Sequence, residues 1–263
     1  MSSALNTTEQ FVSLQSATIY VKTWTPRNIL KEIPIILLHD SLGCTDTWRD
    51  FPSLLAEKTG CVVVSYDRWG FGRSSARNEL PSIHFISEEG KIHLPAILDA
   101  LNIEKFLLFG HSVGGAMSVV TAGALPRRCH GIITESAQAF VEDRTREGIS
   151  KAEVDFKDPK MMARLEKYHG DKARWVLDAW IKVWLSPNFS VWSLKDQLPL
   201  VQCPLMAIHG DKDEYGSFQF PEMIHRLTKG PSEMHILPDC GHVPHREKTE
   251  EILKLCSRFY GDL

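Results

Sequence analysis

Residues 105–116 read Lys-Phe-Leu-Leu-Phe-Gly-His-Ser-Val-Gly-Gly-Ala, an apolar run followed by a serine between glycines and then by small residues. We predict a buried strand over residues 105–109 and a helix over residues 113–124, with Ser112 at the turn between them. A serine at a sharp strand-to-helix turn presents its hydroxyl oxygen, and the flanking glycines permit the crowded backbone that such a turn requires. The alternative is that Ser112 serves only as the N-cap of the helix.

Strands and helices alternate along most of the remaining chain. Short β-branched or apolar runs predict strands, and longer stretches with apolar residues three and four positions apart predict helices. Such alternation indicates an α/β fold with a mainly parallel, doubly wound sheet covered by helices on both faces. The strands are expected at residues 17–23, 34–39, 61–66, 131–134, 204–209 and 233–237, and the helices at residues 48–57, 87–101, 218–227 and 249–259.

Residues 137–197 interrupt this alternation, because they show helical periodicity and many charges but no convincing strand. We interpret the segment as a helical cap inserted into one core domain, which consists of residues 1–136 and 198–263. Within the cap, Trp180 and Trp184 share one helical face. Their rings either pack against the core or line an apolar substrate pocket beneath the cap.

The composition argues against several other classes of protein. Lys and Arg number 30 against 33 Asp and Glu, which gives a formal net charge of -3 and no basic stripe for nucleic acid. No long apolar run occurs and residues 1–10 are polar, so we expect no membrane segment, no signal peptide and a cytoplasmic protein. The six cysteines lack metal-ligand spacing, so we expect reduced thiols and no bound metal.

The loops after the predicted strands hold the groups that could activate Ser112. A serine hydroxyl is a poor nucleophile unless a base takes its proton and an acid orients that base. In a parallel sheet these loops meet beyond the carboxyl ends of the strands. Asp211 and Asp213 follow one strand and His242 follows the last, in the order expected for a serine on a strand-to-helix turn.

With these motifs in place, the chain resembles the α/β-hydrolase fold family over nearly its whole length. The resemblance implies the fold of that family, a helical cap and a serine hydrolase activity that needs no cofactor. It rests on segments that occur in the family's order: His39-Asp40-Ser41-Leu42-Gly43, Tyr66-Asp67-Arg68-Trp69-Gly70-Phe71-Gly72-Arg73-Ser74, Gly110-His111-Ser112-Val113-Gly114, Gly210-Asp211-Lys212-Asp213 and Gly241-His242-Val243-Pro244-His245.

The resemblance also selects among the candidate acids and bases. The family's acid lies three residues after the glycine that ends its strand, which matches Asp213 and leaves Asp211 to shape the turn. Some members take the acid from the preceding strand, which ends here at Glu135. The family's base matches His242 rather than His245.

The resemblance assigns the oxyanion hole to the backbone amides of Ser41 and Val113. In the family the first of these loops usually reads His-Gly-x, whereas Asp40 replaces the glycine here. A carboxylate there would oppose the developing negative charge unless it is turned away, hydrogen-bonded or protonated. We hypothesise that Asp40 points outward or binds a local amide, so that Asp40→Gly would leave turnover nearly unchanged.

These assignments predict a cofactor-independent serine hydrolase that cleaves a small to medium apolar carboxylic ester and binds neither nucleic acid nor a membrane. The same residues would also serve a hydrolase of carbon–carbon bonds, a lactonase, an acyltransferase, or a ligand-binding protein that retains the scaffold. Because the proposed pocket is apolar and aromatic, the ester is favoured. We expect its lining to include Asp40, His111, Trp180 and Trp184.

Overall fold

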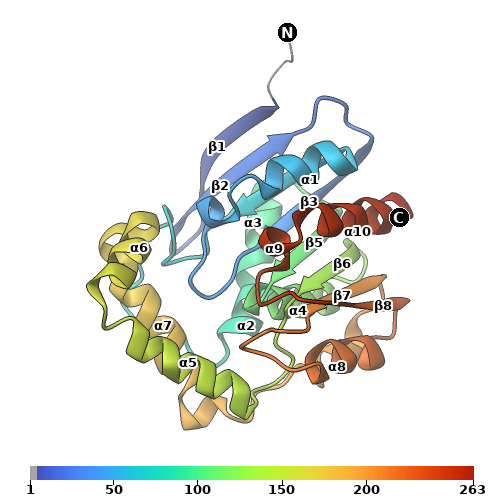
Figure 1. Ribbon diagram of the computed structural model, residues 1–263. Coiled ribbons are helices and arrows are strands. Elements are labelled where there is room, and N and C mark those ends of the chain that lie inside the picture. Colours follow the sequence, from blue (N-terminus) through green and yellow to red (C-terminus); the bar gives the residue numbers. More distant parts are fainter. Residues whose placement is uncertain (1–4) are drawn as a thin grey trace.

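The computed structural model describes residues 5–263, whose strands form a single eight-stranded sheet (Figure 1). The expectation for residues 1–10 therefore lies partly outside the described residues. The strand order is β1-β2-β4-β3-β5-β6-β7-β8, in which β2 pairs antiparallel with both β1 and β4, and all other neighbours are parallel. The strands are β1 Asn6–Ser13, β2 Thr18–Thr25, β3 Lys31–Leu38, β4 Cys61–Tyr66, β5 Phe106–His111, β6 Cys129–Glu135, β7 Leu205–Gly210 and β8 Ser232–Leu237.

Helices cover both faces of the sheet, which confirms the predicted fold class (Figure 1). Leu55 and Cys256, from α1 and α10, belong to the buried cluster on one face, and Met117 and Ile224, from α4 and α8, to the cluster on the other. Successive side chains of β5 alternate between these clusters, so the strand reads as an uninterrupted apolar run. The helices of the core are α1 Phe51–Thr59, α2 Phe85–Glu88, α3 Leu94–Ala100, α4 Val113–Ala124, α8 Gln219–Leu227, α9 Pro244–Glu247 and α10 Thr249–Gly261.

The first strand, β1, is absent from the sequence prediction. It forms the edge of the sheet and pairs only with β2, so most of its side chains are exposed and Val12 alone is buried. A polar strand exposed on both faces carries none of the apolar alternation by which strands are recognised.

The helix predicted over residues 87–101 is divided into α2 and α3 by a π-helical stretch at Glu89–His93. Pro95 lies in the first turn of α3 and has no N–H to continue the hydrogen-bond ladder, which accounts for the break. Gly90 in the π-helical stretch packs against α4, where a Cβ would lie 2.7 Å from Cγ1 of Val120. The break therefore lies where this segment approaches α4 most closely.

Between β6 and β7 the chain forms α5 Asp143–Asp155, α6 Pro159–His169 and α7 Ala173–Trp184, which we call the cap helices. They form a group of their own beside the sheet (Figure 1). Within residues 5–263, no helix combines the length and apolar character needed to cross a membrane.

Candidate active site

Ser112 occupies a strained turn between β5 and α4. Its φ is 56° and its ψ is -125°, a backbone conformation that residues other than glycine rarely adopt. The N–H of Ser112 donates to the carbonyl oxygen of Glu135 at 2.8 Å. A Cβ on Gly114 would overlap the carbonyl oxygen of Leu38, so only glycine fits at that position. The Ser112 side chain makes no capping hydrogen bond to α4, so the structure contradicts the N-cap alternative.

The structure brings Ser112, Asp213 and His242 into one hydrogen-bonded chain. Nε2 of His242 lies 3.0 Å from Oγ of Ser112, and its Nδ1 lies 2.8 Å and 2.9 Å from the two carboxylate oxygens of Asp213. Because an ionised carboxylate only accepts, Nδ1 carries the ring proton and Nε2 is left to accept the proton of Ser112. Asp211 instead accepts a hydrogen bond from the N–H of Cys240 at 3.2 Å, which supports its expected role in the turn.

Burial and pairing compete in setting the pKa values of this chain of groups. Burial lowers the pKa of His242, but the charge and hydrogen bond of Asp213 raise it, and the result lies above the ordinary 6.5. Burial raises the pKa of Asp213, but the charge and hydrogen bond of His242 lower it by more, so the pKa lies below the ordinary 3.8. The acid therefore stays ionised while the imidazole becomes a stronger base.

The loop that carries Asp213 is held by its own amides and by the cap. The N–H groups of Tyr215 and Gly216 donate to Oδ1 of Asp213 at 2.8 Å and 3.2 Å. From α5, Nη1 of Arg144 donates to the carbonyl oxygen of Asp213 at 3.2 Å, and Oγ1 of Thr145 donates to that of Tyr215 at 2.6 Å. A cap helix thus fixes the backbone at the acid and directly after it.

The loop after β3 lies against the turn that carries Ser112, as the contact between Leu38 and Gly114 requires. Ser41 and Ser112 line the same cavity, and the N–H of Val113 is the first of α4. The first N–H groups of a helix have no partner within it and point toward a site where negative charge can be stabilised. Ser41 and the start of α4 therefore both lie next to the cavity at Ser112.

The structure contradicts one half of the hypothesis for Asp40, because its carboxylate binds no local amide, while the side chain is about 32% exposed. Its Oδ1 is buried without a hydrogen-bond partner, and its Oδ2 lies 3.7 Å from Nδ1 of His111. The backbone holds the residue in this position, because its carbonyl oxygen accepts from Nη2 of Arg68 at 2.7 Å and from Nδ1 of His39 at 2.8 Å. Asp40 lines the cavity beside Ser112.

A cavity of about 240 Å³ opens at Ser112 between the core and the cap. Trp180 and Trp184 of α7 line it, as expected, but His111 does not, because it is buried and its Nε2 bonds the carbonyl oxygen of His242 at 2.8 Å. The lining residues are Asp40, Ser41, Leu42, Ser112, Gln138, Thr145, Ile149, Trp180, Trp184, Glu214, Tyr215, His242 and Val243.

Sequence reasoning missed Gln138, which lies directly beside the serine. Its side-chain amide is buried, and its Nε2 lies 3.2 Å from Oγ of Ser112. While the hydroxyl of Ser112 donates to His242, its oxygen can only accept from a third group, so the amide nitrogen of Gln138 is the donor. Gln138 comes from the loop between β6 and α5, which carries no motif.

Glu135 is buried and bonds a different histidine from the one beside Ser112. Its Oε2 lies 2.6 Å from Nδ1 of His245, so it does not serve as the acid that orients His242. Burial raises the pKa of Glu135 to about 7 and lowers that of His245 to about 3. Glu135, His245 and His111 each offer one atom that could bind a metal ion, and these three atoms lie within 4.8 Å of one another. The Glu135–His245 hydrogen bond engages two of them without a metal.

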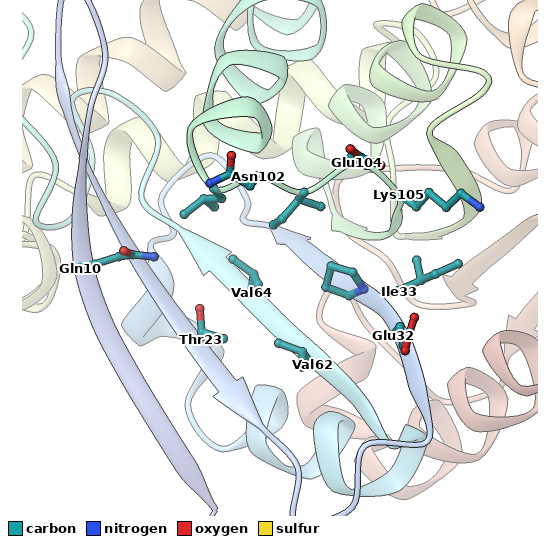
Figure 2. A pocket seen from close by; sticks show the side chains of 12 residues that line it. Gln10, Thr23, Glu32, Ile33, Val62, Val64, Asn102, Glu104 and Lys105 are labelled. Atoms are coloured by element: carbon teal, nitrogen blue, oxygen red, sulfur yellow. The ribbon is translucent and has the colours of Figure 1, made fainter.

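A larger cavity of about 450 Å³ lies away from Ser112 (Figure 2). Glu32 and Val62, near the amino ends of β3 and β4, line it together with residues of the loop before β5, including Asn102 and Lys105. None of its lining residues bonds Ser112, and ligand sites of such sheets lie at the opposite edge.

Comparisons with known proteins agree with this architecture. A family model described as alpha/beta hydrolase fold matches residues 33–159. Serine hydrolase BPHL of Homo sapiens is 28% identical over 235 residues, which cover 86% of this chain and 78% of that protein. Esterase YbfF of Escherichia coli is 24% identical over 260 residues, which cover 92% and 98%. The crystal structure of a proline iminopeptidase from Mycobacterium smegmatis shares the fold with a TM-score of 0.73 at 21% identity, covering 97% and 98%.

Proposed function

Because this chain belongs to the α/β-hydrolase fold family and is an enzyme of that fold, we propose that it is a serine hydrolase of small carboxylic esters. The observation that carries the proposal is the aligned chain from Ser112 through His242 to Asp213, with distances of 3.0 Å and 2.8 Å. Such a chain activates a serine hydroxyl for attack on a carbonyl carbon.

The mechanism follows from the positions of these groups. His242 accepts the proton of Ser112 as Oγ attacks the ester carbonyl, and Asp213 stabilises the imidazolium that forms. The amides of Ser41 and Val113 donate to the oxyanion of the tetrahedral intermediate. His242 then gives its proton to the departing alcohol, and water releases the acid from the acyl-enzyme by the same route.

The cavity favours an ester over the keto acids that a hydrolase of carbon–carbon bonds would take. A substrate carboxylate calls for a cationic partner, and no Lys or Arg is among the residues that line the cavity, whereas Asp40 and Glu214 are. A volume of about 240 Å³ suits a small ester. The name of Esterase YbfF is in keeping with this choice.

The test combines labelling with turnover. Wild type should gain one adduct from a fluorophosphonate, detected by intact mass, and should hydrolyse p-nitrophenyl acetate and butyrate over many turnovers. Ser112→Ala should lose both properties, with a fall in kcat of about 1000-fold or more, because the serine and its base act as a unit.

The control is Ser53→Ala, which removes a hydroxyl in α1 that donates to the carbonyl oxygen of Asp50 and does not line the cavity. This variant should react like wild type. A wild type that is neither labelled nor active above the Ser112→Ala background would overturn the proposal, and a ligand-binding role for the scaffold would replace it.

A further inference from the structure

Two carboxylate side chains line the cavity at Ser112. Asp40 and Glu214 line it, and His242 is the one basic side chain in its lining. Among the described residues, no Lys or Arg nitrogen lies within 4.0 Å of either carboxylate, and His111 is the sole ion-pair neighbour of Asp40. The fixed charges in the lining are therefore those of two carboxylates, one on the loop after β3 and the other, exposed, on the loop after β7.

His111 does not neutralise Asp40. Its Nε2 bonds the carbonyl oxygen of His242 at 2.8 Å and carries the ring proton, so a neutral ring presents a lone pair on Nδ1 to Oδ2 of Asp40, 3.7 Å away. Burial lowers the pKa of His111 to about 4, so the ring is neutral near pH 7. His111 therefore supplies no positive charge to Asp40 near pH 7.

The two carboxylate oxygens of Asp40 lie in different surroundings. Its Oδ1 is buried beside Gly43 and has no hydrogen-bond partner, whereas the side chain as a whole is about 32% exposed and lines the cavity. A carboxylate in the lining of a cavity attracts a cationic group that enters it.

Aromatic rings also line the cavity. Trp180 of α7 and Tyr215 of the acid loop meet edge to face with their ring centroids 5.9 Å apart, and Tyr215 contacts His242 at 4.9 Å. The faces of such rings attract organic cations. Carboxylates together with aromatic rings are the lining expected around an ammonium group that is also partly apolar.

We propose that the preferred substrates are small esters that carry a positively charged amine, held by Asp40 and Glu214 and packed against Trp180. This inference rests on the ester hydrolysis proposed above and specifies its substrate class. A cation at this position would also offset the repulsion between Asp40 and the oxyanion that forms at the Ser41 amide. The ammonium group can lie on the acid or on the alcohol side of the ester.

Two isosteric pairs of esters distinguish these sides. Benzyl alaninate and benzyl isobutyrate differ by an ammonium in place of a methyl group on the acid side. Choline butyrate and 3,3-dimethylbutyl butyrate differ by a quaternary nitrogen in place of a carbon on the alcohol side. In at least one of the two pairs, kcat/KM for the cationic ester should be at least about tenfold higher than for its neutral partner. This preference should fall as ionic strength rises.

Asp40→Asn and Glu214→Gln should each lower the cationic-to-neutral ratio of kcat/KM, by about threefold or more, because each removes one charge without changing shape. The ratio cancels general damage to the site, since both esters are measured on the same variant. Glu153→Gln, an exposed glutamate of α5 outside the cavity, should leave the ratio at its wild-type value.

The inference would be overturned if, in both pairs, kcat/KM for the neutral ester equalled or exceeded that for the cationic ester. It would also be overturned if Asp40→Asn and Glu214→Gln both left the cationic-to-neutral ratio of kcat/KM unchanged. If the neutral esters are hydrolysed in a Ser112-dependent way without a cation preference, the proposed function stands and this inference falls. If no ester of either pair is hydrolysed above the Ser112→Ala background, both fall.

Discussion

The turn that carries Ser112 and the cap helices line the same cavity, but they constrain it in different ways. At the turn the backbone decides, because the φ of 56° at Ser112 and the overlap that any Cβ on Gly114 would cause leave little freedom of sequence. In the cap, side chains such as Trp180 form the wall, and the helix would tolerate other apolar residues there. We therefore expect the turn to determine the reaction, and the cap helices to share the choice of substrate with the loops that carry Asp40 and Glu214.

The largest expected effect separates the two aspartates that follow β7. Asp213→Asn should lower kcat by about 10⁴-fold, because an amide cannot hold the imidazole of His242 in the tautomer that accepts from Ser112. Asp211→Asn should keep kcat within about threefold, because an amide oxygen can still accept from the N–H of Cys240. Steady-state kinetics with p-nitrophenyl butyrate measures both. Equal losses would contradict the assignment of the acid.

Gly114→Ala tests whether the turn tolerates any side chain. The added Cβ would overlap the backbone oxygen of Leu38, so unfolding in urea should show a loss of about 3 kcal/mol in the free energy of unfolding. Gly261→Ala is the matched control, since nothing lies within 4 Å of its Cβ position at the end of α10. That variant should unfold within about 1 kcal/mol of wild type. A Gly114→Ala protein of wild-type stability would show that the turn is not constrained.

The pH dependence of kcat/KM reports the state of His242 in the free enzyme. The pKa of His242 is raised and its protonated ring cannot accept from Ser112, so activity should fall about tenfold per pH unit on the acid side, with a midpoint above 6.5. A midpoint below 6 would contradict the pairing with Asp213.

Folding must be followed over the same range by circular dichroism. Burial lowers the pKa of His111 to about 4 and of His245 to about 3. These groups stabilise the fold above the unfolded value of 6.5, and this contribution is lost as pH falls toward their folded values. The activity midpoint is valid only where the signal stays native.

Arg144→Met tests how far the cap contributes to the chemistry. The change removes the donor from α5 to the carbonyl oxygens of Asp213 and Gly216, so kcat should fall by about tenfold through a less ordered acid loop. Arg146→Met changes a residue of the same helix whose side chain has no hydrogen-bond or ion-pair partner in the described part of the chain, so this variant should match wild type. Identical kcat values for the two variants would mean that the cap contributes only to the choice of substrate and not to the order of the acid loop.

The smallest effect is expected at the cap wall. Trp180→Phe enlarges the cavity, so the ratio of kcat/KM for p-nitrophenyl butyrate to that for the acetate should rise by a few fold, about 1 kcal/mol at most. Trp175→Phe, on the same helix but outside the cavity, should leave this ratio unchanged. If Trp175→Phe changed the butyrate-to-acetate ratio more than Trp180→Phe did, Trp180 would not be the residue that limits the acyl chain.

The same comparison explains which parts could be predicted from the sequence. The turn at Ser112 and the loops with Asp213 and His242 follow buried strands, and both glycine spacing and apolar runs are visible in one dimension. Strand β1 is polar and Gln138 lies in a loop without a motif, so neither carries such a signal.

Orientation is a second limit of sequence reasoning. Asp40 and His111 both stand in recognisable motifs, yet the structure turns the first toward the cavity and buries the second behind it. The cause lies in partners that are distant in the chain: Arg68 holds the backbone of Asp40, and the carbonyl oxygen of His242 holds His111. Such contacts depend on how the strands are arranged, which composition and spacing do not reveal.

The most direct test of the central claim is to trap the acyl-enzyme. Wild type mixed with p-nitrophenyl butyrate and quenched in acid during turnover should show the protein mass plus one butyryl group, and peptide mapping should place that group on Ser112. Catalysis without any acylated protein, or acylation at another residue with Ser112→Ala still active, would contradict the account.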